Sequence, residues 1–124
     1  MTQPSSARPE FESISPVFPV SDVRAAVAFY RERLGFDLGW IVGDPPTHAH
    51  VCRGAVGISL TLKPSQAGRG EAYVELRGVD SYFAELSARG LELGKLADRT
   101  YGMRDFALTD VDGNRIVFGE AIVA

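Results

Sequence analysis

The sequence predicts an α+β fold in which two βαβββ repeats form a curved mixed sheet with helices on its outer face. Segments with the alternation typical of strands surround two segments with the apolar spacing of helices. The same order of segments recurs after about 55–56 residues, so the chain contains an internal repeat. Two copies are too few for a solenoid, and we expect two half-sheets packed side by side under two helices.

The repeat suggests how the 124 residues are divided. We expect a flexible N-terminal arm at residues 1–12, a first module at 13–63, a linker at 64–70 and a second module at 71–124. The arm is rich in Ser and Pro and lacks the basic start and apolar stretch of a signal peptide. The chain is long enough for one structural domain with one core.

The first module begins with a strand at residues 13–20. Its prolines, Pro16 and Pro19, place it at a sheet edge or a junction, because proline cannot donate to a strand ladder. A helix runs from the cap Ser21–Asp22 to Gly35. Its apolar stripe consists of Val23, Ala26, Val27, Tyr30 and Leu34. Three strands complete the module, at residues 36–42, 48–53 and 56–62.

The second module repeats this order. A strand at 71–77 precedes a helix at 78–89, whose stripe consists of Val79, Tyr82, Phe83 and Leu86. Residues 91–96 form a strand or an irregular segment. The chain closes with a hairpin, residues 104–109 and 115–119, around the turn residues 110–114. Glu120 follows this hairpin, and we expect its side chain to face solvent.

Three strands alternate between two kinds of side chain. Aliphatic residues take one face, and we expect that face to lie under the helices. The opposite face carries Ser59 and Thr61, then Tyr73, Glu75 and Arg77, then Arg115 and Val117. Two interpretations of this open face remain. It is either a solvated sheet surface or the wall of a ligand cleft.

The composition argues against several classes of protein. A net charge of −3 argues against nucleic acid as a partner, which would favour a basic surface. No apolar run is long enough to cross a membrane. The single cysteine, Cys52, excludes an internal disulfide framework and fits a reducing compartment, so we expect a cytoplasmic protein.

Two motifs resemble the vicinal oxygen chelate superfamily, which includes glyoxalase I, extradiol dioxygenases, fosfomycin-modifying enzymes and bleomycin resistance proteins. The first motif spans residues 20–36 and contains Val-Ser-Asp-Val, Ala-Phe-Tyr and Leu-Gly-Phe. The second is Phe-Ala-Leu-Thr-Asp-Val-Asp-Gly-Asn at 106–114. With the repeat, the resemblance extends over residues 14–120. It implies the repeated βαβββ fold, while the same scaffold supports several functions.

The enzymes of this superfamily bind a divalent metal through His, Glu or Gln side chains on the first and last strands of each half. In this sequence the corresponding places are Ser15, Ser59 or Thr61, Tyr73 and Val117. Valine cannot coordinate a metal, and neutral hydroxyls are poor ligands for a lone divalent ion. We therefore expect no metal, no cofactor and no catalytic residue of the family type.

An alternative interpretation is that the protein is an enzyme. His48 and His50 are two residues apart on one predicted strand, so they share a face, and Glu75 is the obvious carboxylate that could join them. This set would support a glyoxalase- or dioxygenase-like enzyme with non-standard metal ligands. A third hypothesis is a domain that binds other proteins and no small ligand.

Within the superfamily the sequence is most similar to the bleomycin resistance proteins, dimers that sequester a cationic drug by aromatic stacking. Residues 72–78 resemble their Ala-Trp-Val-Trp-Val-Arg-Gly segment, and residues 101–108 resemble their Trp-Gly-Arg-Glu-Phe-Ala-Leu segment. The resemblance implies a metal-free homodimer that binds a planar or cationic ligand such as an antibiotic. The expected ligand-binding residues are Trp40, His50, Tyr73, Glu75, Tyr101, Arg115 and Val117. Asp105 is either a second anionic group facing the ligand, a solvated carboxylate, or a partner of Arg77 or Arg115.

Overall fold

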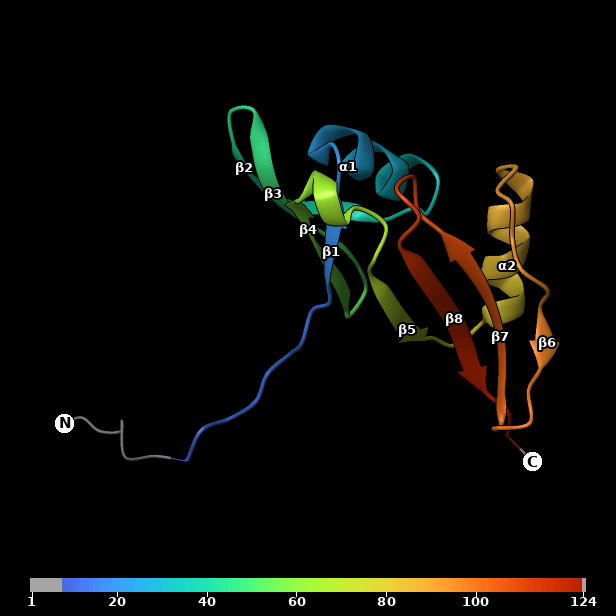
Figure 1. Ribbon diagram of the computed structural model, residues 1–124. Helices are drawn as coiled ribbons and strands as arrows, with labels where there is room; N and C mark the ends of the chain where they lie inside the picture. The colour runs from blue at the N-terminus through green and yellow to red at the C-terminus, as the bar shows by residue number, and fades with distance from the viewer. Residues whose placement is uncertain (1–7, 124) are drawn as a thin grey trace.

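The computed structural model describes residues 8–123 and contains two four-stranded sheets, each with a helix on one face (Figure 1). The first half consists of β1 (Val17–Val20), α1 (Val23–Glu32), β2 (Asp37–Gly43), β3 (Pro46–Arg53) and β4 (Val56–Leu62). A 3₁₀ turn, η1 (Pro64–Gln66), leads to the second half. That half consists of β5 (Glu71–Glu75), α2 (Val79–Ala88), β6 (Ala97–Asp98), β7 (Met103–Thr109) and β8 (Arg115–Ala121).

The strand order confirms the predicted α+β repeat. The first sheet has the order β1-β4-β3-β2 and the second has the equivalent order β5-β8-β7-β6. In each sheet the first strand pairs in parallel with the last, and the other pairs are antiparallel. β1 is an edge strand, as its prolines predicted.

Residues 8–16 extend away from the body of the molecule (Figure 1). Part of the arm expected at residues 1–12 lies outside the described residues. Residues 8–16 form neither helix nor strand, and Phe11 and Ile14 are 98% and 93% exposed. The strand predicted from residue 13 therefore begins only at Val17, although Pro16 O still accepts a hydrogen bond from Ser59 N–H of β4 at 3.0 Å.

The core lies between the helices and the sheets, where the alternation placed it. Ile58, Leu60, Ile116 and Phe118 are all buried, together with the apolar stripe of α1 and most of the stripe of α2, in which Phe83 is only partly buried. Burial of such side chains removes apolar surface from water, which contributes about 1.5–3 kcal/mol for each large residue. No helix among the described residues has both the length and the apolar character needed to cross a membrane.

The two helices begin in different ways. The Asp22 carboxylate accepts a hydrogen bond from the Ala25 backbone N–H at 3.1 Å, as expected for an N-cap. α2 has Gly78 at this position, which has no side chain to cap it. The Glu120 carboxylate accepts from Gly78 N–H and Val79 N–H, each at 3.0 Å. The expectation that Glu120 faces solvent was therefore wrong, because this carboxylate caps a helix about forty residues away in sequence.

The two halves contact each other through equivalent positions of the repeat. An Arg33 Nη donates to Arg89 O at 3.1 Å, and an Arg89 Nη donates to Arg33 O at 3.0 Å. The segment expected as a linker also joins the halves. Gly68 N–H donates to Pro19 O at 3.3 Å, and Gly70 N–H donates to the Asn114 side chain at 2.7 Å. These bonds attach the segment to both sheets.

Candidate functional site

A groove of about 760 Å³ lies on the open face of the second sheet. It contains five of the seven predicted site residues: Tyr73, Glu75, Tyr101, Arg115 and Val117. Asp105, for which a position facing the ligand was one of the alternatives, also lines the groove. Three further residues that were not predicted as ligand contacts complete the lining: Arg99, Met103 and Ala107. The groove is thus built from β5, β7 and β8 and from the segment between β6 and β7.

The strand register explains why these side chains share a face. Tyr73 on β5 pairs with Val117 on β8, and Val117 pairs with Ala107 on β7. Val117 is only 8% exposed, whereas Tyr73 is 47% exposed. The open face of this sheet therefore has an apolar floor at Val117 beside an accessible aromatic ring.

Asp105 lines the groove and is almost fully buried, with 2% of its surface exposed. Its carboxylate accepts hydrogen bonds from the Tyr73 hydroxyl at 2.9 Å and from the Tyr101 hydroxyl at 2.6 Å. Arg99 Nε donates to the other carboxylate oxygen at 2.8 Å. The partners expected for Asp105, which were solvent, Arg77 or Arg115, are therefore wrong.

This network shifts the titration of its members in opposite directions. Burial raises the pKa of the Asp105 carboxyl, but the hydrogen bonds from Tyr101, Arg99 and Tyr73 outweigh burial and hold this pKa below its usual range. Burial and the hydrogen bond to Asp105 raise the pKa of the Tyr73 phenol well above its usual value. The bond to Asp105 also raises the pKa of Tyr101. Both phenols are thus neutral donors at neutral pH.

The remaining charges of the groove differ in their pairing. The Arg115 guanidinium pairs with the Glu71 carboxylate at 2.6 Å, and Arg99 pairs with Asp105. Glu75 is exposed and forms no ion pair with any residue between 8 and 123. Glu75 therefore leaves a negative charge at the groove that a cationic ligand could neutralise.

The other two predicted site residues lie on the first sheet. Trp40, His50, Ser59 and Val17 form one row across β2, β3, β4 and β1. The Trp40 and His50 rings stack with centroids 5.7 Å apart and planes 13° apart, and Trp40 is 48% exposed. Trp40 is consequently not a core residue. Neither ring lines the groove on the second sheet.

The residues at the metal positions of the superfamily do not fit a divalent cation. Val117 has no donor atom, and the Tyr73 hydroxyl already donates a hydrogen bond to Asp105 at 2.9 Å. The alternative set is also not assembled within one chain, because His48 and His50 lie on β3 and Glu75 lies on β5. Residues 8–123 contain no group of three His, Cys, Asp or Glu side chains arranged to hold a metal ion.

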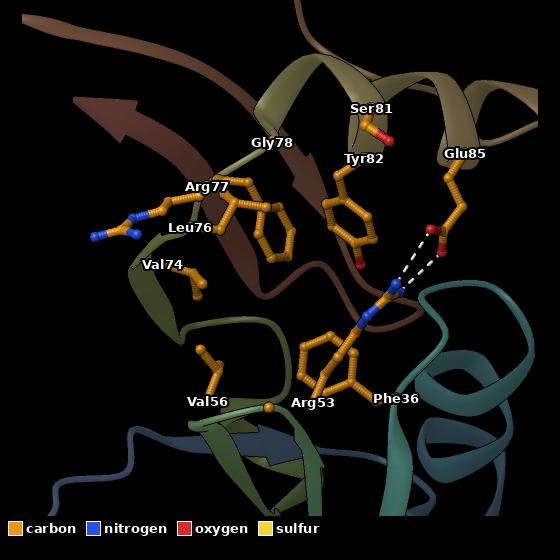
Figure 2. Close-up of a pocket in the computed structure, with 12 residues that line it drawn as sticks. Phe36, Arg53, Val56, Val74, Leu76, Arg77, Gly78, Ser81, Tyr82 and Glu85 are labelled. Carbon is orange, nitrogen blue, oxygen red and sulfur yellow. Dashed lines mark hydrogen bonds and ion pairs between the residues drawn. The ribbon is translucent and has the colours of Figure 1, made fainter. Parts of the chain in front are cut away.

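A second cavity, of about 350 Å³, lies between α2 and the β3–β4 turn (Figure 2). The turn between β3 and β4 has two residues, whereas the longer β7–β8 turn reaches β1, where Asn114 donates to Pro19 O at 3.0 Å. The shorter turn leaves this space unfilled. Arg53 and Glu85, at its edge, neutralise each other through bonds of 2.8 and 3.1 Å. Arg77 also lines this cavity and forms no ion pair with a described residue. The unpaired charge of the cavity is therefore positive, whereas Glu75 gives the groove a negative one.

The comparisons with known proteins agree with the fold. The profile of the Glyoxalase/Bleomycin resistance protein/Dioxygenase superfamily matches residues 13–118. A bleomycin resistance protein from Geobacillus stearothermophilus is 26% identical over 132 residues, which cover 86% of this chain and 95% of the relative. A relative of the same description and identity occurs in Staphylococcus aureus.

Two solved structures show the same architecture. The bleomycin-binding protein from bleomycin-producing Streptomyces verticillus, complexed with copper(II)-bleomycin, has a TM-score of 0.78 and 26% identity. The similarity covers 94% of this chain and 100% of that one. An antibiotic-binding protein from Streptomyces sp. CB03234 has a TM-score of 0.73 and 26% identity, covering 89% and 97%. The chain belongs to the Glyoxalase/Bleomycin resistance protein/Dioxygenase superfamily.

Proposed function

We propose that this protein sequesters a planar, cationic small molecule, such as an antibiotic, without metal and without catalysing a reaction on it. The observation that carries the proposal is the groove, which combines two accessible tyrosine rings with the unpaired carboxylate of Glu75. Aromatic faces attract flat rings and cations, and a nearby carboxylate adds charge complementarity. The names of the relatives support the same ligand class, because they are bleomycin resistance proteins and antibiotic-binding proteins.

The proposal extends to a homodimer in which the binding cleft is completed by a second copy. The first sheet presents Trp40, stacked on His50, and the exposed side chains of Val17 and Val42. These groups lie outside the groove of their own chain. In the proposed dimer, the first sheet of one copy places them against the groove of the other copy. The projecting apolar residues Phe11 and Ile14 supply further surface for such a contact.

We also propose that the two halves, residues 13–63 and 71–124, act as one structural domain joined by residues 64–70, and that the protein is cytoplasmic. Hydrogen bonds between the halves support the first part, among them the reciprocal Arg33–Arg89 pair and the bond from Tyr30 to Asp110. The single cysteine supports the second.

Calorimetric titration with two probes, bleomycin and the planar cationic dye ethidium, tests the binding function. We expect saturable binding with a change in Trp40 fluorescence, unaffected by a chelator. Tyr73→Ala should weaken binding by about fivefold to 150-fold, because one stacked ring contributes roughly 1–3 kcal/mol. Val111→Ala, at an exposed turn outside the groove, is the matched control. Absence of binding by both probes, or equal affinities for wild type and Tyr73→Ala, would contradict the proposal.

Light scattering tests the dimer separately. We expect a particle of twice the 13.4 kDa chain mass. Trp40→Ala should weaken ligand binding although Trp40 does not line the groove of its own chain. A monomeric particle that binds the probes with full affinity would refute the shared cleft while leaving the binding function intact.

A further inference from the structure

We propose that the two carboxylates of the groove have different tasks: Asp105 positions the rings of Tyr73 and Tyr101, and Glu75 contacts the cationic group of the ligand. This inference rests on the proposed binding function and deepens it. It makes Asp105 a positioning residue and Glu75 the determinant of charge specificity.

The first step is the geometry of Asp105. Its carboxylate is 2% exposed and accepts from both tyrosine hydroxyls, at 2.9 and 2.6 Å. The two tyrosines come from different elements, β5 and the segment between β6 and β7, so nothing local in the sequence fixes them relative to each other. One shared acceptor fixes both, which reduces the entropy lost when a ligand stacks on the rings.

The second step is the charge of Asp105. Arg99 neutralises it through the Nε bond of 2.8 Å, and Arg99 is itself held by a bond from an Nη to Lys95 O at 2.8 Å. With three donors on two oxygens and little exposed surface, this carboxylate is unsuited to pair with a ligand. Glu75 has the opposite properties, since it is exposed and has no ion pair with a described residue.

The third step is the space above β8. Tyr73 on β5 and Asp105 on β7 are separated by β8, and Gly119 is paired in register with Asp105. A Cβ atom at Gly119 would overlap the Tyr73 hydroxyl and lie 3.0 Å from the Asp105 Cβ. Because Gly119 has no side chain, the Tyr73 phenol can cross β8 and donate to Asp105.

Two probes with the same ring system separate the two tasks: cationic ethidium and its uncharged parent, phenanthridine. Glu75→Gln should weaken ethidium binding by about tenfold or more, because a charge-assisted contact is lost, and should leave phenanthridine binding unchanged. Asp105→Asn should weaken the binding of both probes by a similar factor. Asp98→Asn, which removes the charge of an exposed carboxylate outside the groove, is the control and should not change the binding of either probe.

A titration of tyrosine ultraviolet absorbance reports on Asp105 without any ligand. In Asp105→Asn the pKa of Tyr101 should fall toward its ordinary value, and the pKa of Tyr73 should fall less because burial persists. Unchanged tyrosine titration in Asp105→Asn, or an equal loss of both probes in Glu75→Gln, would overturn the inference. If neither probe binds wild type, the Glu75 assignment fails with the proposed function, and the tyrosine titration still decides the role of Asp105.

Discussion

Asp110 organises the turn of the closing hairpin in the way that Asp105 organises the groove. It is 5% exposed and accepts from the backbone N–H groups of Asp112 and Asn114, each at 2.9 Å. The Asn114 side chain and the Tyr30 hydroxyl donate to its second oxygen, also at 2.9 Å. The dense turn chemistry at 110–114 predicted a tight turn but could not reveal that a tyrosine of α1 completes it.

Tyr30→Phe should therefore destabilise the fold. Tyr30 is fully buried, and the substitution leaves the buried Asp110 carboxylate with one donor fewer. We expect a loss of about 1–3 kcal/mol in the free energy of unfolding, measured by urea titration. Tyr101→Phe removes the hydroxyl of a residue that is 63% exposed and should cost less. Equal stability of Tyr30→Phe and wild type would show that the bond to Asp110 contributes nothing.

At the scale of elements, the sequence pattern predicted the features that depend on residues close together in the chain. The apolar stripes, the Asp22 cap and the closing hairpin follow from spacing and turn chemistry, and the structure confirms them. Contacts between distant elements were missed. Glu120 caps α2 and Asp105 binds Tyr73, and no residue next to either one in the chain indicates its partner.

The β5–β8–β7 arrangement predicts a coupled effect at Gly119. Gly119→Ala should reduce stability and probe binding together, because the new methyl group overlaps the Tyr73 side chain and displaces it from Asp105. Tyr73→Leu, whose side chain is too short to meet the methyl group, should restore part of the stability but none of the stacking. Strictly additive effects of the two substitutions on unfolding would be inconsistent with this contact.

At the scale of the molecule, the repeat was visible in the sequence, and the structure confirms it in two equivalent strand orders. The division of the candidate site was not visible. Five of the seven predicted residues meet in one groove, while Trp40 and His50 lie on the other sheet. Alternation assigns a residue to a face of its own sheet, but it does not state which faces share a cavity. Trp40 and His50 are separated from the other five residues by the arrangement of the two sheets in space, which the alternation does not contain.

The whole molecule should lose stability in alkali. Burial raises the pKa of Tyr30, and it raises the pKa of Tyr82 to about 12. Because an unfolded tyrosine ionises near pH 10, the unfolded state loses protons first, so stability is complete below about pH 10 and falls above it. Urea midpoints at increasing pH should decline less steeply in Tyr82→Phe. An identical decline in this variant and wild type would contradict the contribution of Tyr82.

A crystal structure of the protein with bleomycin bound is the measurement that tests the central claim most directly. The predicted result is a flat ring system stacked on Tyr73 or Tyr101, with a cationic group near the Glu75 carboxylate and the Asp105 hydrogen bonds intact. Bleomycin bound in the cavity between Phe36 and Tyr82, or bound with Tyr73, Tyr101 and Glu75 all free of contact, would contradict the account.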